Sequence, residues 1–153
     1  MKVITLTNEQ VQAAHSLATK IKSSKPYTMN WDVSSISIGV LGEMAYAAHS
    51  GQTVCEKVWA DKCDGGVDFE DGTDVKTITW TGPSPELKMG RLPMNSKKKK
   101  LVLAICDYKK DPNTVMLMGE ISYENFKLKA RLKTYGDKSW YAVTADELDV
   151  TYN

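Results

Sequence analysis

The stretch Cys63–Thr77, CDGGVDFEDGTDVKT, gathers acidic and basic side chains around two glycine turns, in a region otherwise typical of β-strands. Asp68 precedes the second glycine turn, and Asp74 and Lys76 follow it. Packing within a sheet would favour apolar or β-branched residues at such positions. The charged residues therefore point to a role other than packing.

The length of the hairpin loop decides which of these side chains meet. With a two-residue loop at Asp71-Gly72, Asp68 would lie on the face opposite Asp74 and Lys76. With a three-residue loop, Gly72 would take the left-handed position of a bulge and Asp68 would lie across from Asp74. Because side chains alternate along a strand, Lys76 would then share their face. In this second arrangement all three charged groups converge.

Two neighbouring carboxylates repel each other and cost stability unless something compensates for their charge. A divalent cation is the natural compensation, since Mg²⁺ prefers carboxylate oxygens and commonly binds substrate phosphates as well. With an ammonium group alongside, such a site suits phosphodiester hydrolysis, in which Lys76 would stabilise developing negative charge or position the attacking water. The alternative is a surface hairpin in which Asp74 and Lys76 form a weak ion pair.

Helices are predicted upstream of this stretch. A capping box formed by Thr7 and Gln10, followed by apolar residues at helical spacing, predicts a helix from about Asn8 to Ser23. A second helix is expected from residues 34–35 to Gly51, where glycine accepts the left-handed conformation of a helix cap. Its apolar stripe is expected at Ile38, Leu41, Ala45 and Ala48.

Glu43 lies off the apolar stripe of the second helix. Its neighbours on the helix surface, Gly39 and Ala47, are small. This small-residue face permits close approach of another backbone or a ligand, and Glu43 is placed beside it.

Downstream of the second helix the pattern becomes extended. Strands are expected around Val54, Val58 and Trp59, as hairpin arms at Val67–Glu70 and Thr73–Trp80, and at Leu101–Tyr108, Val115–Ile121 and Trp140–Val143. A long irregular loop is expected over Thr81–Ser96, and a short helix over Ser122–Phe126. This order of elements predicts one domain, residues 1–153, of the α+β or α/β type with a mixed central sheet.

The series Leu41-Gly42-Glu43-Met44-Ala45, Gly65-Gly66-Val67-Asp68-Phe69 and Asp74-Val75-Lys76 resembles the PD-(D/E)XK nuclease superfamily. In that superfamily a helical glutamate is followed by an aspartate on one strand and an acid-x-lysine on the next. By this resemblance the catalytic residues are Glu43, Asp68, Asp74 and Lys76, and the three acids are the metal ligands.

The resemblance implies an α/β fold with a restriction-endonuclease-like core, in which helices flank a mixed central sheet. It also implies a Mg²⁺- or Mn²⁺-dependent deoxyribonuclease, of a kind used in restriction, recombination, repair or phage DNA processing. Cutting both strands of DNA would favour a symmetric homodimer.

A second group of residues is basic. An uninterrupted lysine run and two nearby cations are expected to contact the phosphates of bound DNA, by charge attraction: Lys97, Lys98, Lys99, Lys100, Lys88 and Arg91. For each lysine taken singly, solubility is the better explanation, and phosphate contact becomes an equal alternative only for the cluster. Trp80 is an expected packing residue that could instead stack on a splayed base.

Several classes of protein are not indicated by the sequence. The three cysteines Cys55, Cys63 and Cys106 have no CxxC spacing, so neither a disulfide framework nor a zinc site is expected. The N-terminus lacks the features of a secretory signal, and no apolar run is long enough to cross a bilayer, so an intracellular protein without membrane contact is expected. The sequence also leaves open a nucleic-acid-binding accessory protein that does not cut, or a structural or inhibitory protein.

Overall fold

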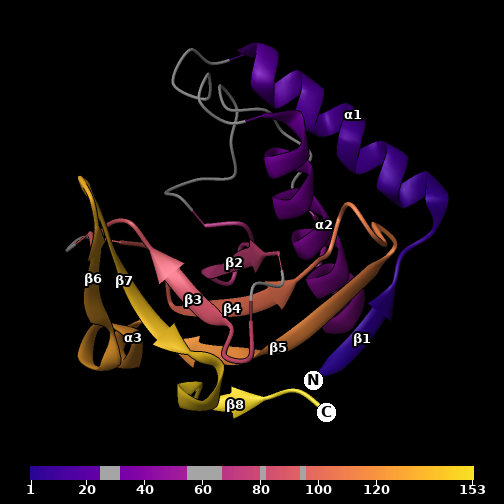
Figure 1. Cartoon of the computed structure of the whole chain (residues 1–153). Coiled ribbons are helices and arrows are strands. Elements are labelled where there is room, and N and C mark those ends of the chain that lie inside the picture. The colour runs from indigo at the N-terminus through magenta and orange to yellow at the C-terminus, as the bar shows by residue number, and fades with distance from the viewer. Residues whose placement is uncertain (25–31, 55–66, 80–81, 94–95) are drawn as a thin grey trace.

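A mixed β-sheet forms the centre of the fold (Figure 1). The computed structural model describes residues 1–24, 32–54, 67–79, 82–93 and 96–153. The strands of the main sheet lie in the order β1 (Lys2–Thr5), β5 (Thr114–Ser122), β4 (Lys100–Ile105) and β2 (Thr73–Ile78), and the short strand β8 (Val150–Thr151) also pairs with β5. β2 runs parallel to β4, whereas the other pairings in this sheet are antiparallel. The protein is therefore an α/β protein with a mixed sheet, as the sequence predicts.

Two helices cover one face of the main sheet. They are α1 (Asn8–Ser24) and α2 (Val33–Ser50), and α2 packs directly against the sheet while α1 packs on α2. The Asp32 side chain accepts a hydrogen bond from the Ser35 N–H at the start of α2, and Gly51 ends the helix with a φ of 75°. Both are common ways to satisfy the free backbone groups of a helix end.

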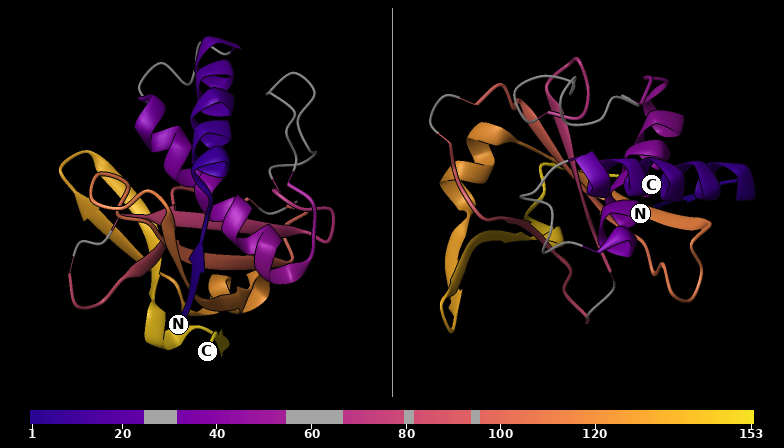
Figure 2. Two further views of the ribbon diagram at one scale, coloured as in Figure 1. Left: turned by 90° about the vertical axis from the view of Figure 1, so that its right-hand side faces the viewer. Right: turned by 90° about the horizontal axis from the view of Figure 1, so that it is seen from above.

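The opposite face is covered by a second, antiparallel sheet. Its strands are, in spatial order, β3 (Glu86–Met89), β7 (Lys138–Thr144) and β6 (Arg131–Tyr135). The helix α3 (Tyr123–Lys129) and the short 3₁₀ helix η3 (Ala145–Glu147) complete this side. In the right-hand view of Figure 2, α1 and α2 lie on one side of the main sheet and β6 and β7 on the other. The expectation of a sheet flanked by helices therefore holds for one face, because a second sheet takes most of the other.

Alternation along the strands divides the core into two layers. Val102 and Ala104 of β4 belong to the cluster beneath α1 and α2, whereas Leu101 and Leu103 belong to the cluster beneath the second sheet. On β2, Val75 packs in the helical layer. Asp74 and Lys76 therefore point to the face that carries the second sheet.

Several predicted elements are confirmed. The helix α1 begins at Asn8 behind the predicted capping box, in which Thr7 and Gln10 exchange hydrogen bonds of 2.8 and 3.1 Å. The predicted second helix and the strands at β4, β5 and β7 are present, and Ser122 caps the predicted short helix by accepting from the Asn125 N–H. Residues Val58, Trp59 and Trp80 lie outside the described parts of the chain.

Other predictions are wrong. Val67–Glu70 is not a strand, because the N–H groups of Asp68 and Phe69 both donate to the Thr73 carbonyl and close a turn. Val54 is not in a strand either, and the expected loop Thr81–Ser96 contains β3. The predicted apolar stripe of α2 is shifted, since Ala48 is exposed while Ile36, Val40 and Tyr46 are buried. Strands β1, β6 and β8 were not predicted, because their sequences show no strong alternation of apolar and polar residues.

Among the residues that the structure describes, no helix has the length and apolar character needed to span a bilayer.

Candidate functional site

The carboxylate of Asp74 lies at the centre of a charged cluster on β2. Asp74 is 2% exposed and interacts with two ammonium groups. The Lys76 Nζ lies 3.0 Å from Oδ1 and 2.9 Å from Oδ2, and the Lys98 Nζ lies 2.5 Å from Oδ2. Such short charge-assisted contacts are what allow a carboxylate to be buried in its charged form.

Asp68 lies beside Asp74 without belonging to a strand. Its N–H donates to the Thr73 carbonyl at 2.9 Å, and its Oδ2 accepts from the Val75 N–H at 2.6 Å. These two hydrogen bonds tie Asp68 to the edge of β2 that does not pair with β4. Gly72, with a φ of 89°, makes the reversal that leads into β2. The predicted three-residue loop is thus present, with Gly72 left-handed and Phe69 opposite Thr73, although the residues before it do not form a strand.

Glu43 reaches the same cluster from α2. The preceding residue, Gly42, lies so close to β2 that a Cβ built on it would be 1.8 Å from the Thr77 Oγ1. The absence of a side chain at Gly42 thus lets α2 lie close against β2, and Glu43 on α2 interacts electrostatically with Asp68 and Asp74. We define Glu43, Asp68 and Asp74 as the carboxylate cluster. The small-residue face predicted beside Glu43 is present, but the close contact is made by Gly42, since a Cβ on Gly39 would meet nothing within 4 Å.

The three acids influence one another electrostatically. Burial, and then the charges of Asp68 and Asp74, raise the pKa of Glu43 well above its usual value. Burial and the charge of Asp74 raise the pKa of Asp68 to about 7. Burial also disfavours ionisation of Asp74, but Lys76 and Lys98 outweigh it and lower its pKa. Asp74 is therefore the charged member of the cluster at neutral pH, while Glu43 and Asp68 tend to hold protons.

The ammonium of Lys76 is kept protonated by the same interactions. Burial opposes its charge, but the charge of Asp74 and the hydrogen bond to it outweigh burial and raise the pKa of Lys76. Asp68 and Glu43 act in the same direction. Lys76 is therefore a cation and hydrogen-bond donor at neutral pH, which suits it to stabilising negative charge and not to accepting a proton.

A pH dependence of stability follows from Asp68. Its pKa is about 7 in the folded protein and about 3.8 when unperturbed. Between these values the folded state holds a proton that the unfolded chain has released, so stability falls as the pH rises through this window, by at most about 1.4 kcal/mol per pH unit for one group. We expect the free energy of unfolding, measured with urea in EDTA from pH 5 to 8, to fall less steeply in Asp68→Asn than in the wild type. The asparagine side chain can still accept the hydrogen bond from the Val75 N–H. Equal slopes of the free energy of unfolding against pH in the two proteins would contradict the raised pKa of Asp68.

The donor set of the cluster suits a hard divalent cation such as Mg²⁺ or Mn²⁺. Carboxylate oxygens are the preferred ligands of Mg²⁺, and the repulsion that protonates Glu43 and Asp68 would be relieved by a bound cation. Within the described residues, however, no three His, Cys, Asp or Glu side chains are already grouped as a metal site. Both oxygens of Asp74 are in contact with ammonium groups, of Lys76 and Lys98. Binding of a cation would require at least one of these contacts to be exchanged.

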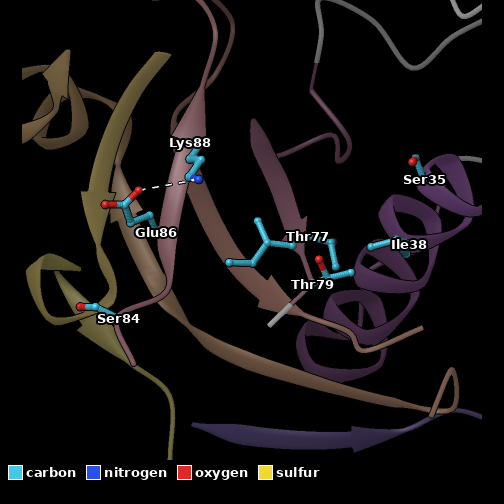
Figure 3. A pocket seen from close by; sticks show the side chains of 8 residues that line it. Ser35, Ile38, Thr77, Thr79, Ser84, Glu86 and Lys88 are labelled. Atoms are coloured by element: carbon cyan, nitrogen blue, oxygen red, sulfur yellow. Dashed lines mark ion pairs between the residues drawn. The ribbon is translucent and has the colours of Figure 1, made fainter. Parts of the chain in front are cut away.

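A cavity of about 580 Å³ lies close to β2 (Figure 3). It lies between α2 and β3 along the C-terminal half of β2, and Thr77, which follows Lys76, lines it. Hydroxyl groups and one acid–base pair dominate the lining: Ser35, Thr77, Thr79, Ser84, Glu86 and Lys88, with Ile38 and Ile78 as the apolar members. A polar cavity of this kind can receive a polar ligand, and Thr77 is the lining residue that follows Lys76 in the chain.

The predicted basic residues divide into inward and outward groups. Lys98 contacts Asp74, and Lys100 contacts Glu120 at 3.2 Å and lies over the ring of Tyr46. These two lysines take part in internal pairs, whereas Lys97 and Lys99 are exposed, and the contact of the run with phosphates stays a prediction.

The other two predicted cations lie on and after β3. Lys88 lines the cavity, where its ammonium is 3.8 Å from Glu86 and 5.3 Å from the centre of the Trp140 ring. Arg91 is exposed. Both are therefore placed where a bound polyanion could reach them.

The role of Lys98 at Asp74 was missed by sequence reasoning. The two residues are 24 positions apart, and only the parallel pairing of β2 with β4 brings them together. The one available signal was the position of Lys98 just before a strongly apolar strand. The His15 and His49 side chains lie outside the carboxylate cluster, and Cys106 is buried with a thiol pKa raised to about 11, mainly by burial. Cys55 and Cys63 lie outside the described residues.

Comparison of the chain with protein-family models, with curated proteins and with solved structures found no match. The evidence for a function is therefore the chemistry of the carboxylate cluster, its two lysines and the cavity close to β2.

Proposed function

We propose that this protein is a divalent-metal-dependent deoxyribonuclease with a restriction-endonuclease-like core. The observation that carries the proposal is the convergence of Glu43, Asp68, Asp74 and Lys76, which come from a helix, a turn and one strand, at one edge of the sheet. Gathering three acids around one buried carboxylate is unfavourable, and the two lysines at Asp74 leave fewer positive than negative groups, so a packing role does not explain the cluster.

Each residue has a distinct role in this proposal. Glu43, Asp68 and Asp74 would hold one or two Mg²⁺ or Mn²⁺ ions, which would supply Lewis-acid activation of the scissile phosphate. Lys76, fixed by Asp74, would donate hydrogen bonds to the phosphoryl oxygens as negative charge develops, or orient the attacking water. Asp68 is itself held by the Val75 N–H, so the cluster is partly organised before any ligand binds.

DNA is the proposed substrate because the surroundings of the cluster suit a polyanion. The cavity along the C-terminal half of β2 is lined by hydroxyl groups and Lys88, and Arg91, Lys97 and Lys99 are exposed. These side chains would bind phosphates outside the reacting one, in a manner that weakens with salt. A symmetric homodimer would allow both strands of a duplex to be cut.

A second candidate is a nucleic-acid-binding protein that does not cut. It is favoured by the two ammonium groups that occupy Asp74, because they neutralise that residue without a metal ion. This candidate predicts binding of DNA that is weakened by salt and indifferent to divalent cations.

One experiment separates these functions. Purified protein is incubated with supercoiled plasmid, single-stranded DNA and branched DNA in Mg²⁺, Mn²⁺ or EDTA, beside Asp74→Ala as the inactive variant. The nuclease proposal expects products with wild type and metal, and none with EDTA or with Asp74→Ala. Salt-sensitive retention of DNA without products would establish the binder, and the absence of both would leave a structural or inhibitory protein.

A further inference from the structure

The lysine run before β4 contains one member that is turned inward. The side chain of Lys98 is 10% exposed and its Nζ lies 2.5 Å from Asp74 Oδ2, whereas its neighbours Lys97 and Lys99 are exposed. The Lys99 N–H donates to the Gly72 carbonyl at 2.9 Å, which fixes this segment beside the start of β2. Backbone pairing therefore places Lys98 at Asp74.

We propose that Lys98 is a place-holding cation, whose ammonium neutralises Asp74 in the metal-free protein and leaves it when a divalent ion binds. The inference rests on the proposed function, because it takes the carboxylate cluster to be a metal site. Once displaced, Lys98 would be available to a phosphate of the substrate near the same oxygen. Lys98 would thus be a positioning residue that couples metal binding to substrate binding.

The charge balance of the cluster supports this exchange. With all groups ionised, three carboxylates face two ammonium groups, so one negative charge is left without a partner. If a divalent ion takes the place of Lys98, three carboxylates face Lys76 and the ion, and the charges cancel.

Lys98 is the lysine that can leave, because the two lysines hold Asp74 differently. Lys76 lies within 3.0 Å of both carboxylate oxygens and shares a strand face with Asp74, so its position is set by β2. The contact of Lys98 with Asp74 is to Oδ2, and Lys98 projects from the segment before β4, so its position is not set by the strand that carries Asp74. Its departure would open one coordination position at Oδ2 and leave the contact between Lys76 and Asp74 in place.

The test is a titration of metal-free protein with Mn²⁺ in the absence of DNA, in which calorimetry measures the affinity for the ion. Lys98→Met removes the competing ammonium and is expected to bind Mn²⁺ at least about 10-fold more tightly than the wild type. Lys98→Arg retains a competing cation, so its affinity for Mn²⁺ is expected to be close to that of the wild type. Lys138→Met, at an exposed position in the hairpin of β6 and β7, is the control for loss of a lysine. If Lys98→Met does not fold, Lys98→Gln, which keeps a donor without the charge, serves in its place.

The outcomes separate this inference from the proposed function. If Lys98→Met binds Mn²⁺ no more tightly than the wild type, the inference is overturned, even if the wild type cleaves DNA. Tighter binding by Lys98→Met supports it, even if no DNA is cleaved and the nuclease proposal fails. Absence of Mn²⁺ binding in every variant overturns both.

Discussion

Lys76→Met is expected to lower the rate of DNA cleavage by a factor of about 100 or more at saturating Mg²⁺. The substitution keeps a side chain of similar length and removes the only ammonium that lies within 3.0 Å of both oxygens of Asp74 among the described residues. The loss should fall on the catalytic rate, because the charge that Lys76 would stabilise develops as the phosphate reacts. Cleavage is measured on plasmid DNA under single-turnover conditions.

The fold of Lys76→Met should be retained, since Lys98 still neutralises Asp74. Circular dichroism and urea unfolding of the variant check this point. Lys138→Met provides the matched control, because it removes an exposed lysine from the hairpin of β6 and β7. A Lys76→Met protein that folds and cleaves at the wild-type rate would remove Lys76 from the mechanism and with it the main support for a nuclease.

Gly42→Ala is expected to destabilise the protein by about 1–3 kcal/mol, although alanine is the better helix former. The new Cβ would be 1.8 Å from the Thr77 Oγ1 and 2.9 Å from the Thr77 Cβ, so α2 or β2 must move. The free energy of unfolding from urea titration measures the effect. Glu43 is the next residue on α2, so the same displacement should also reduce DNA cleavage.

Gly39→Ala is the matched control for this prediction. It is the same change in the same helix, one turn earlier, where a Cβ would meet nothing within 4 Å. This variant should be neutral or up to about 1 kcal/mol more stable than the wild type, because alanine lowers the entropy of the unfolded chain and favours the helix. Equal stability of the two variants would show that α2 does not approach β2 as closely as the structure has it.

Local sequence patterns predicted the parts of the fold that depend on local interactions. The capping box at Thr7 marks the start of α1 because its hydrogen bonds span three residues. Gly51 marks the end of α2 for a similar reason. The strand β4 could be recognised because it is buried on both faces and is therefore apolar throughout.

The failed predictions concern segments whose conformation depends on distant partners. Val67–Glu70 has the composition of a strand, but its N–H groups turn back onto Thr73. The segment around β3 contains prolines and a glycine, yet Glu86–Met89 becomes a strand because β7 supplies a pairing edge. Such pairing energy comes from residues far along the chain, so no local pattern contains it.

The same division applies to the candidate site. The sequence by itself determined that Asp74 and Lys76 share a face, because side chains alternate along any strand, and it identified Glu43 and Asp68 as the acids to consider. Only the tertiary structure decided that Asp68 joins them from a turn, that Gly42 lets α2 lie close against β2, and that Lys98 takes one oxygen of Asp74. These contacts depend on how α2 packs on β2 and how β2 pairs with β4, and packing across such separations is set by the whole core, whereas alternation is a property of the backbone alone.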